Sequence, residues 1–183
     1  MLKWIRVCAL AALVTALAAP AFATTAVRLS NDAMAANADV IAIGTAIDIQ
    51  TVWEGRTLVT VVTLKVNESL KGDAASTLSI ALPGGIDATR RLPVAMTYAG
   101  APTIGLGEEV FVFLTRDADI QSGLTVVGFA QGKFSIVSDA SGNRFVSRDL
   151  TTLMLESGAG ITAGTRSLAS LNEFRAEIAA YVR

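Results

Sequence analysis

From Asp39 onward, apolar residues recur with a period of two over most of the chain. Successive side chains of a strand point to opposite faces of a sheet, so this periodicity predicts strands. Its clearest instance is a pair of long, β-branched runs on either side of residues 53–56, where Gly55 is able to take a positive φ. The two runs predict an antiparallel hairpin.

Residues 110–114 (Val-Phe-Val-Phe-Leu) contain no polar side chain, which predicts a central strand covered on both faces. Shorter strands are expected along the rest of the chain. The third and fourth of them are expected to pair as a second hairpin, and the full set is residues 77–82, 90–98, 124–130, 133–138 and 144–148.

Seven or so strands with one short helix at each end argue against a βαβ alternation and for a sandwich or barrel. Closure of the sheet would also remove the open strand edges that invite aggregation. We therefore expect a mainly β fold, an OB-like small β-barrel that is closed or partly open. A short helical turn at residues 30–38 precedes the barrel, and a C-terminal amphipathic helix follows it.

Residues 1–23 have the three parts of a cleavable signal peptide. Lys3 and Arg6 give a positive start, residues 7–19 are apolar, and a small-x-small site ends at Ala23. The apolar run is shorter than the roughly 20 residues that a membrane-spanning helix needs. We expect Sec-type export with cleavage near Ala23, which places the mature protein in a periplasm or outside the cell.

The mature chain is expected to divide into a barrel domain (24–150), a linker (151–169) and a helix (170–183). The linker is rich in glycine and threonine and lacks periodicity. Ser170 and Glu173 have the spacing of a capping box at the start of the helix. The helix is expected to pack on the barrel, or alternatively to serve a partner or a membrane surface, through one apolar stripe: Leu171, Phe174, Ile178 and Tyr181.

Composition removes several classes of chemistry. The chain has no histidine, and its one cysteine, Cys8, lies in the predicted signal peptide. This composition excludes histidine-dependent nucleophilic catalysis and nearly all zinc, copper and iron sites from the mature chain that we predict. Without Lys3 and Arg6 the acidic residues outnumber the basic ones, so no basic face for nucleic acid is expected. We predict no catalytic residue, no cofactor and no metal.

The acidic residues offer no catalytic or metal-binding pattern. Glu108 and Glu109 are adjacent, and neighbours on a strand point to opposite faces. Asp117 and Asp119 occupy the first two ligand positions of a calcium loop, but the glycine and glutamate that such a loop needs are missing.

A candidate binding surface lies in the loops at one end of the predicted barrel. An aromatic residue beside the turn glycine is a possible recognition anchor, although packing over the barrel end is the alternative. A nearby arginine pair forms a small basic spot, which is either a solvated edge or an anion site. The candidate residues are Trp53, Gly84, Gly85, Arg90 and Arg91.

Four short segments are similar to a known family. Residues 38–45 (Ala-Asp-Val-Ile-Ala-Ile-Gly-Thr) resemble the opening strand of netrin-like domains, and 66–72 and 107–114 resemble later strands. These OB-type barrels occur in tissue inhibitors of metalloproteinases and in netrin and complement modules. Exported bacterial proteins of unassigned function carry the same set, together with a segment like 128–134. The resemblance implies a fold.

The resemblance does not carry over a functional residue. Metalloproteinase inhibitors of this family chelate zinc through an N-terminal cysteine, whereas the expected first residue here is Thr24 and the mature chain has no cysteine. The disulfides of the animal domains are missing for the same reason.

These observations predict an exported, non-enzymatic module that binds an unidentified protein or saccharide. No nucleic-acid partner and no membrane span after signal cleavage are expected. One alternative is a protease inhibitor that inserts a loop or an edge strand without chelating zinc. Another is a hydrolase that depends on two carboxylates facing each other across a cleft.

Overall fold

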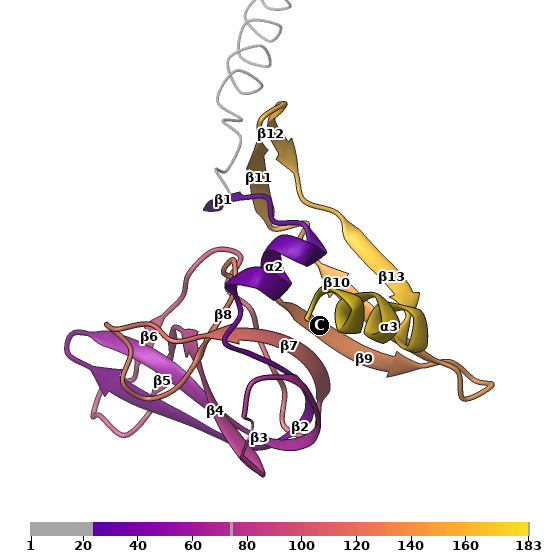
Figure 1. Cartoon of the computed structure of the whole chain (residues 1–183). Coiled ribbons are helices and arrows are strands. Elements are labelled where there is room, and N and C mark those ends of the chain that lie inside the picture. Colours follow the sequence, from indigo (N-terminus) through magenta and orange to yellow (C-terminus); the bar gives the residue numbers. More distant parts are fainter. Residues whose placement is uncertain (1–23, 74, 183) are drawn as a thin grey trace, which may run out of the picture.

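The computed structural model describes residues 24–73 and 75–182, and the predicted signal peptide lies outside them. The chain is mainly β (Figure 1). Its longest elements are β2 (Val40–Glu54) and β3 (Thr57–Lys71), which pair antiparallel from Ile41 opposite Lys71 to Glu54 opposite Thr57. Gly55, with φ of 59°, makes the turn between them, as the alternating pattern predicts.

The hairpin belongs to an eight-stranded sheet. Its order is β13-β10-β9-β7-β2-β3-β4, and β8 pairs with β7 off this path. The remaining strands of the sheet are β4 (Thr77–Pro83), β7 (Glu109–Thr115), β8 (Thr125–Val126), β9 (Lys133–Ser138), β10 (Arg144–Asp149) and β13 (Arg166–Ser170).

Of the closed or partly open barrel that the sequence predicts, the closed form does not occur among the described residues, because the sheet keeps β4 and β13 as open edges. Three register shifts interrupt the β2–β3 pairing, a feature that increases the local bend and twist. A single bridge, between Ile80 of β4 and Leu124, joins β4 to the segment that leads into β8. Since β8 is only two residues long, the pairing goes no further and the sheet stays open.

The expected second hairpin is also wrong. β8 and β9 do not pair with each other but lie along the same edge of β7, at Leu114–Thr115 and at Val110–Val112. Residues 127–132 loop out between them, and the loop closes by a hydrogen bond from Gly132 N to Val127 O of 3.0 Å. A Cβ on Gly132 would lie 3.1 Å from the Cβ of Phe113, so glycine permits the close return.

The two apolar faces of β7 meet two separate cores. One face packs with residues of β2, β3 and β4, among them Leu64 and Ile80. The other face carries Phe111 and Phe113 and is covered by α2 (Asn31–Asn37) and α3 (Leu171–Tyr181). Phe174 of α3 lies 5.0 Å from Phe111, measured between ring centroids. The strand without a polar face is therefore central, as its sequence predicts.

The C-terminal helix uses most of its predicted stripe. Leu171, Phe174 and Ile178 are buried, whereas Tyr181 is 47% exposed. Ser170 makes no side-chain capping hydrogen bond, so the predicted capping box does not form. Packing against the sheet, and not the cap, is what fixes this helix.

Residues 151–169, expected as a linker, instead contain strands. These are β11 (Leu153–Ser157), β12 (Gly160–Ala163) and β13. β11 pairs with β12 and, in parallel, with β1 (Thr24–Val27), which makes a second, three-stranded sheet. Leu153 and Leu155 are buried there. The expected boundary at residue 150 is therefore not a structural boundary, because β13 completes the main sheet from beyond it.

Gln131 joins the N-terminal segment to the loop beside β7. Its side chain is buried, and Nε2 donates to the carbonyls of Val27 (2.7 Å) and Gly128 (3.2 Å). Oε1 accepts the amide hydrogen of Leu29 at 2.9 Å. Three backbone groups thus bond to one side-chain amide, and of these the Gly128 carbonyl also accepts the backbone N–H of Gln131.

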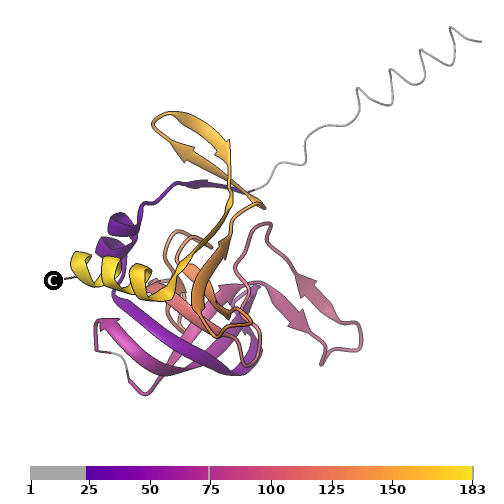
Figure 2. The same ribbon diagram turned by 90° about the vertical axis from the view of Figure 1, so that its right-hand side faces the viewer.

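A third sheet is made of β5 (Gly85–Asp87) and β6 (Val94–Met96). Residues 84–99, which we name the arm, stand out from the side of the main sheet in Figure 2. The expected strand at 90–98 is reduced to β6, so the arginine pair lies in the loop between the two strands. None of the helices among the described residues is long and apolar enough to span a membrane.

We predict that Phe174→Ala lowers the free energy of unfolding by about 3–5 kcal/mol, because it opens a cavity between α3 and the rings of β7. Tyr181→Ala on the same helix is the control and should stay within about 0.5 kcal/mol of the parent. Urea denaturation followed by circular dichroism measures both. Equal effects of the two substitutions would contradict the packing.

We also predict that Gln131→Leu costs on the order of 3 kcal/mol, since the Val27 carbonyl and the Leu29 amide lose their side-chain partner and the Gly128 carbonyl loses one of two. Hydrogen exchange should speed up at the Leu29 amide. Gln50→Leu on exposed β2 surface serves as the matched control. A Leu29 amide that keeps its protection in the Gln131 variant would refute the link.

Candidate functional site

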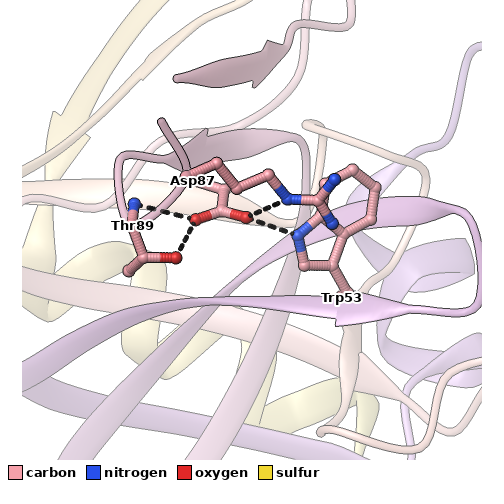
Figure 3. Close-up of polar contacts among 4 residues, drawn as sticks. Trp53, Asp87 and Thr89 are labelled. Carbon is pink, nitrogen blue, oxygen red and sulfur yellow. Dashed lines mark hydrogen bonds and ion pairs between the residues drawn. The ribbon is translucent and has the colours of Figure 1, made fainter. Parts of the chain in front are cut away.

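The candidate site forms where the tip of the β2–β3 hairpin meets the arm. Trp53 lies next to the last residue of β2, so its indole reaches over the hairpin end toward β5. Its Nε1 donates to Oδ2 of Asp87, the last residue of β5, at 2.8 Å (Figure 3). Asp87 is only 9% exposed. A long, twisted hairpin and a short strand after β4 are thus joined through side chains.

The carboxylate of Asp87 is the centre of this site and accepts four hydrogen bonds. Oδ1 accepts from the amide (3.0 Å) and the hydroxyl (2.6 Å) of Thr89, as Figure 3 shows. Oδ2 accepts from Trp53 and from Nε of Arg90 at 2.9 Å. We name Trp53, Asp87, Thr89 and Arg90 the clasp.

Hydrogen bonds hold Asp87 in its ionised form. The hydroxyl of Thr89 is the main cause, followed by the indole of Trp53 and the amide of Thr89, and together they place the pKa of Asp87 far below its usual range. A carboxyl group held this way does not take up a proton near neutral pH. Asp87 therefore acts as a fixed negative charge for Arg90 and Trp53.

Arg90 covers the indole of Trp53. The guanidinium carbon lies 4.6 Å from the ring centroid, in a cation–π geometry. Its Nε is at the same time in an ion pair with Asp87. One face and the only polar atom of Trp53 are thus used inside the protein, so this aromatic ring holds the arm and is not an open stacking surface.

The structure brings together only part of the predicted surface. Trp53 and Arg90 meet in the clasp. Gly84 and Gly85 lie at the base of the arm, where a Cβ would be 2.6 Å from the Met96 carbonyl and 2.7 Å from Thr51 Cγ2, respectively. These glycines permit close packing of the arm, and both line an apolar pocket against it. Arg91 is exposed in the loop beyond them.

Asp87 and Thr89 are the residues that the sequence analysis missed. An aspartate followed two residues later by threonine is the signature of a turn in which the carboxylate accepts the backbone N–H. That local turn signal is visible in the sequence. The hydrogen bond between Asp87 and Trp53 is not, because the two residues are 34 positions apart and only the fold brings them together.

The arm has an inner and an outer face because its strands alternate. Inside, Asp87 faces Trp53, and the sulfur of Met96 accepts the amide hydrogen of Leu58 at 3.2 Å. Outside, Ile86 lies opposite Ala95 and is 63% exposed. Leu92, in the loop, is 78% exposed. The clasp therefore secures the inner face and leaves aliphatic side chains on the outer one.

Two neighbouring apolar pockets lie beside β4 and the loop after the arm, and one of them is also lined by the arm. The pocket against the arm has a volume of about 370 Å³ and includes Met96, Tyr98 and Ile104. The second has about 310 Å³ and includes Ile120 and Phe129. Both share three walls: Leu82, Pro83 and Pro102.

The adjacent pair Glu108 and Glu109 points to opposite faces. Glu108 accepts from Nζ of Lys133 at 2.6 Å and from the hydroxyl of Ser135 at 2.7 Å. Glu109 pairs with Arg144. Burial raises the pKa of Glu108, but the hydrogen bonds from Lys133, Gly105 and Ser135 outweigh it and lower the pKa below its usual value.

The acidic residues of the predicted calcium-like pattern close a turn. Oδ1 of Asp117 accepts the amide hydrogen of Asp119 at 3.0 Å. Across residues 24–73 and 75–182, no group of three His, Cys, Asp or Glu side chains is arranged to hold a metal ion.

Comparison with protein-family models, with curated proteins and with solved structures gives no match to this chain. The netrin-like resemblance therefore stays a prediction.

We predict that Asp87→Asn loosens the arm, because the amide cannot hold Arg90 as the carboxylate does. The pKa of Asp87 is lower in the folded than in the unfolded chain, so its contribution to stability is complete at neutral pH and is lost as the pH falls below about 3.8. The difference in melting temperature between parent and variant should shrink over that range. A difference that does not change with pH would show that the charge of Asp87 contributes nothing.

Proposed function

We propose that the mature chain is an exported, non-enzymatic binding module whose contact surface is the outer side of the arm. The observation that carries this proposal is the exposure of Ile86, Leu92 and Tyr98 on one short segment that the clasp holds in place. Single exposed apolar residues are ordinary, but several on one fixed projection mark an interaction surface. Fixing the arm in advance also lowers the entropy lost on binding.

The clasp supports a protein partner over a saccharide. Sugar recognition relies on an open aromatic face and free polar groups, whereas Arg90 covers Trp53 and Asp87 takes its N–H. The outward side chains of the arm are mainly aliphatic, which suits the apolar centre of a protein interface.

The sheet geometry supports a partly open, OB-like barrel. In this arrangement the arm belongs to the loops at one end of the barrel. The register shifts of the β2–β3 hairpin and the Ile80–Leu124 bridge bring β4 back toward β8. Loops at the end of such barrels are a common place for ligands to bind. The netrin-like resemblance is consistent with this arrangement.

Export is part of the proposal and rests on the signal-peptide pattern of residues 1–23. The mature chain has no cysteine, so its stability does not depend on the redox conditions of the compartment. We place it in a periplasm or outside the cell.

The described carboxyl groups support a non-enzymatic role over the carboxylate hydrolase. A glycosidase needs an acid whose pKa is raised. Every carboxyl group in the described segments whose pKa is shifted has it lowered, and the group comprises Asp32, Asp39, Asp87, Glu108, Asp139 and Asp149.

The absence of cysteine from the mature chain allows a direct test. Leu92→Cys labelled with a benzophenone should form a discrete cross-link with a protein of the native envelope or culture medium. Unlabelled parent protein should compete, and adding Ile86→Asp should remove the cross-link. Leu168→Cys on β13, where Leu168 is 63% exposed, is the matched control and should give none. Identical cross-links from both positions would reject the arm as the contact surface.

A further inference from the structure

The pocket against the arm borders one of the two main cores. It is lined by Leu82 and Ile104, which are buried members of the core that also holds Leu64 and Ile80. Pro102, which is buried as well, forms part of the wall. The volume of about 370 Å³ is within the range of small-molecule sites. The buried part of the lining is therefore apolar and large enough for a ligand.

The exposed part of the lining is neutral. Ile86 and Ala95 come from the outer face of the arm, and exposed hydroxyl groups are supplied by Thr97, Tyr98 and Thr103. None of the described residues that line the pocket carries a charge. An ion that entered it would lose hydration without gaining a partner of opposite charge, which costs free energy. The lining thus favours an uncharged ligand.

Hydrogen bonds hold the walls of the pocket in place. On the side of the arm, the hydroxyl of Thr60 donates to the Gly84 carbonyl at 2.7 Å. On the side of the following loop, the amide of Gly105 donates to the Glu108 carboxylate at 2.7 Å. The clasp fixes the arm beyond its base. The pocket is therefore preformed, so a ligand that enters it needs to order few groups of the protein.

We propose that this pocket binds a small neutral molecule with a hydrocarbon body and one hydroxyl or carbonyl group. The hydrocarbon part would pack against Leu82, Met96 and Ile104, and the polar group would lie beside the exposed hydroxyl of Tyr98. Methionine suits such a site because its flexible thioether adapts to the shape of a ligand. This inference goes beyond the proposed function, because it needs no protein partner.

The neighbouring pocket differs in charge, which gives the proposal a built-in comparison. That pocket, of about 310 Å³, is lined by the carboxylate residue Asp117. It shares Leu82, Pro83 and Pro102 with the pocket against the arm. A cationic ligand would gain from this carboxylate, whereas a neutral ligand would not. The charge of a ligand therefore distinguishes the two pockets.

The methionine methyl groups report on the site directly. Residues 24–183 contain three methionines. Met96 lines the pocket, Met34 lies in the other main core, and Met154 lies in β11. In NMR spectra of protein with isotope-labelled methionine methyl groups, 1-hexanol should shift the Met96 signal in a saturable manner at millimolar concentrations. The signals of Met34 and Met154 should not move.

Chain length and charge of the probe give a quantitative test. The affinity should rise about fourfold for each CH₂ group from 1-butanol to 1-hexanol, the effect of burying one methylene. Hexanoate and hexylammonium should bind at least about tenfold more weakly than 1-hexanol. The proposal is overturned if hexylammonium binds more tightly and shifts the amide signals of Ile120 and Phe129 in place of those of Ile86 and Ala95.

Two variants fill the pocket from opposite walls. Ala95→Phe on exposed β6 and Ala101→Leu in the following loop should each abolish the shift of Met96 by 1-hexanol. Ala163→Phe on exposed β12 is the matched control and should leave binding unchanged. Circular dichroism melts establish which variants are folded. Undiminished binding in either folded pocket variant, or a Met96 signal that moves no more than that of Met154, would reject the site.

The proposed function is judged separately by the cross-link from Leu92→Cys. Saturable binding of 1-hexanol without a specific cross-link would keep the small-molecule site and reject the arm as a protein contact surface. A specific cross-link without binding of 1-hexanol would keep the contact surface and reject the small-molecule site.

Discussion

The structure depends on the need to cover both faces of β7. Five consecutive residues, Val110–Leu114, are fully buried, so a single sheet face or a single helix cannot satisfy them. The fold meets this need with two different covers. The β2–β3–β4 part of the sheet bends round one face, and α2 and α3 close the other with a cluster of phenylalanine rings. β7 pairs with β2 along one edge and with β8 and β9 along the other. Its alternate side chains enter the two cores, so both cores share this one strand.

The alternating pattern identified strands well where the partner strand is close in sequence. β2 and β3 are long, adjacent and joined by a glycine turn, so their pairing follows from the sequence alone. The pattern failed where the partner is distant: it paired the β8 and β9 segments with each other, although both pair with β7. It also gave no sign of β11 and β12, which pair with each other although they are close in sequence, because residues 151–166 show no alternation. Alternation indicates that a segment is a strand and does not indicate which edge it joins.

The clasp shows the same limit for side chains. Trp53 and the arginine pair were candidates because of their chemistry, and Gly84 and Gly85 because they lie in a loop at one end of the predicted barrel. Asp87, which holds Trp53 and Arg90, has no unusual neighbours in sequence apart from Thr89. Its importance comes from four donors that converge from β2, from the arm loop and from the backbone. A buried ion with saturated hydrogen bonds is a property of the fold and is visible only there.

The parallel pairing of β1 with β11 has a consequence for how the chain reaches its native state. Thr24 lies beside Leu153, so the first described strand finds its place only when most of the polypeptide is present. Topologies with such high contact order fold slowly. The three-stranded sheet has no means of assembling completely before residues 153–163 have been made. The same contact that delays folding then fixes the first described strand to the part of the chain beyond residue 150.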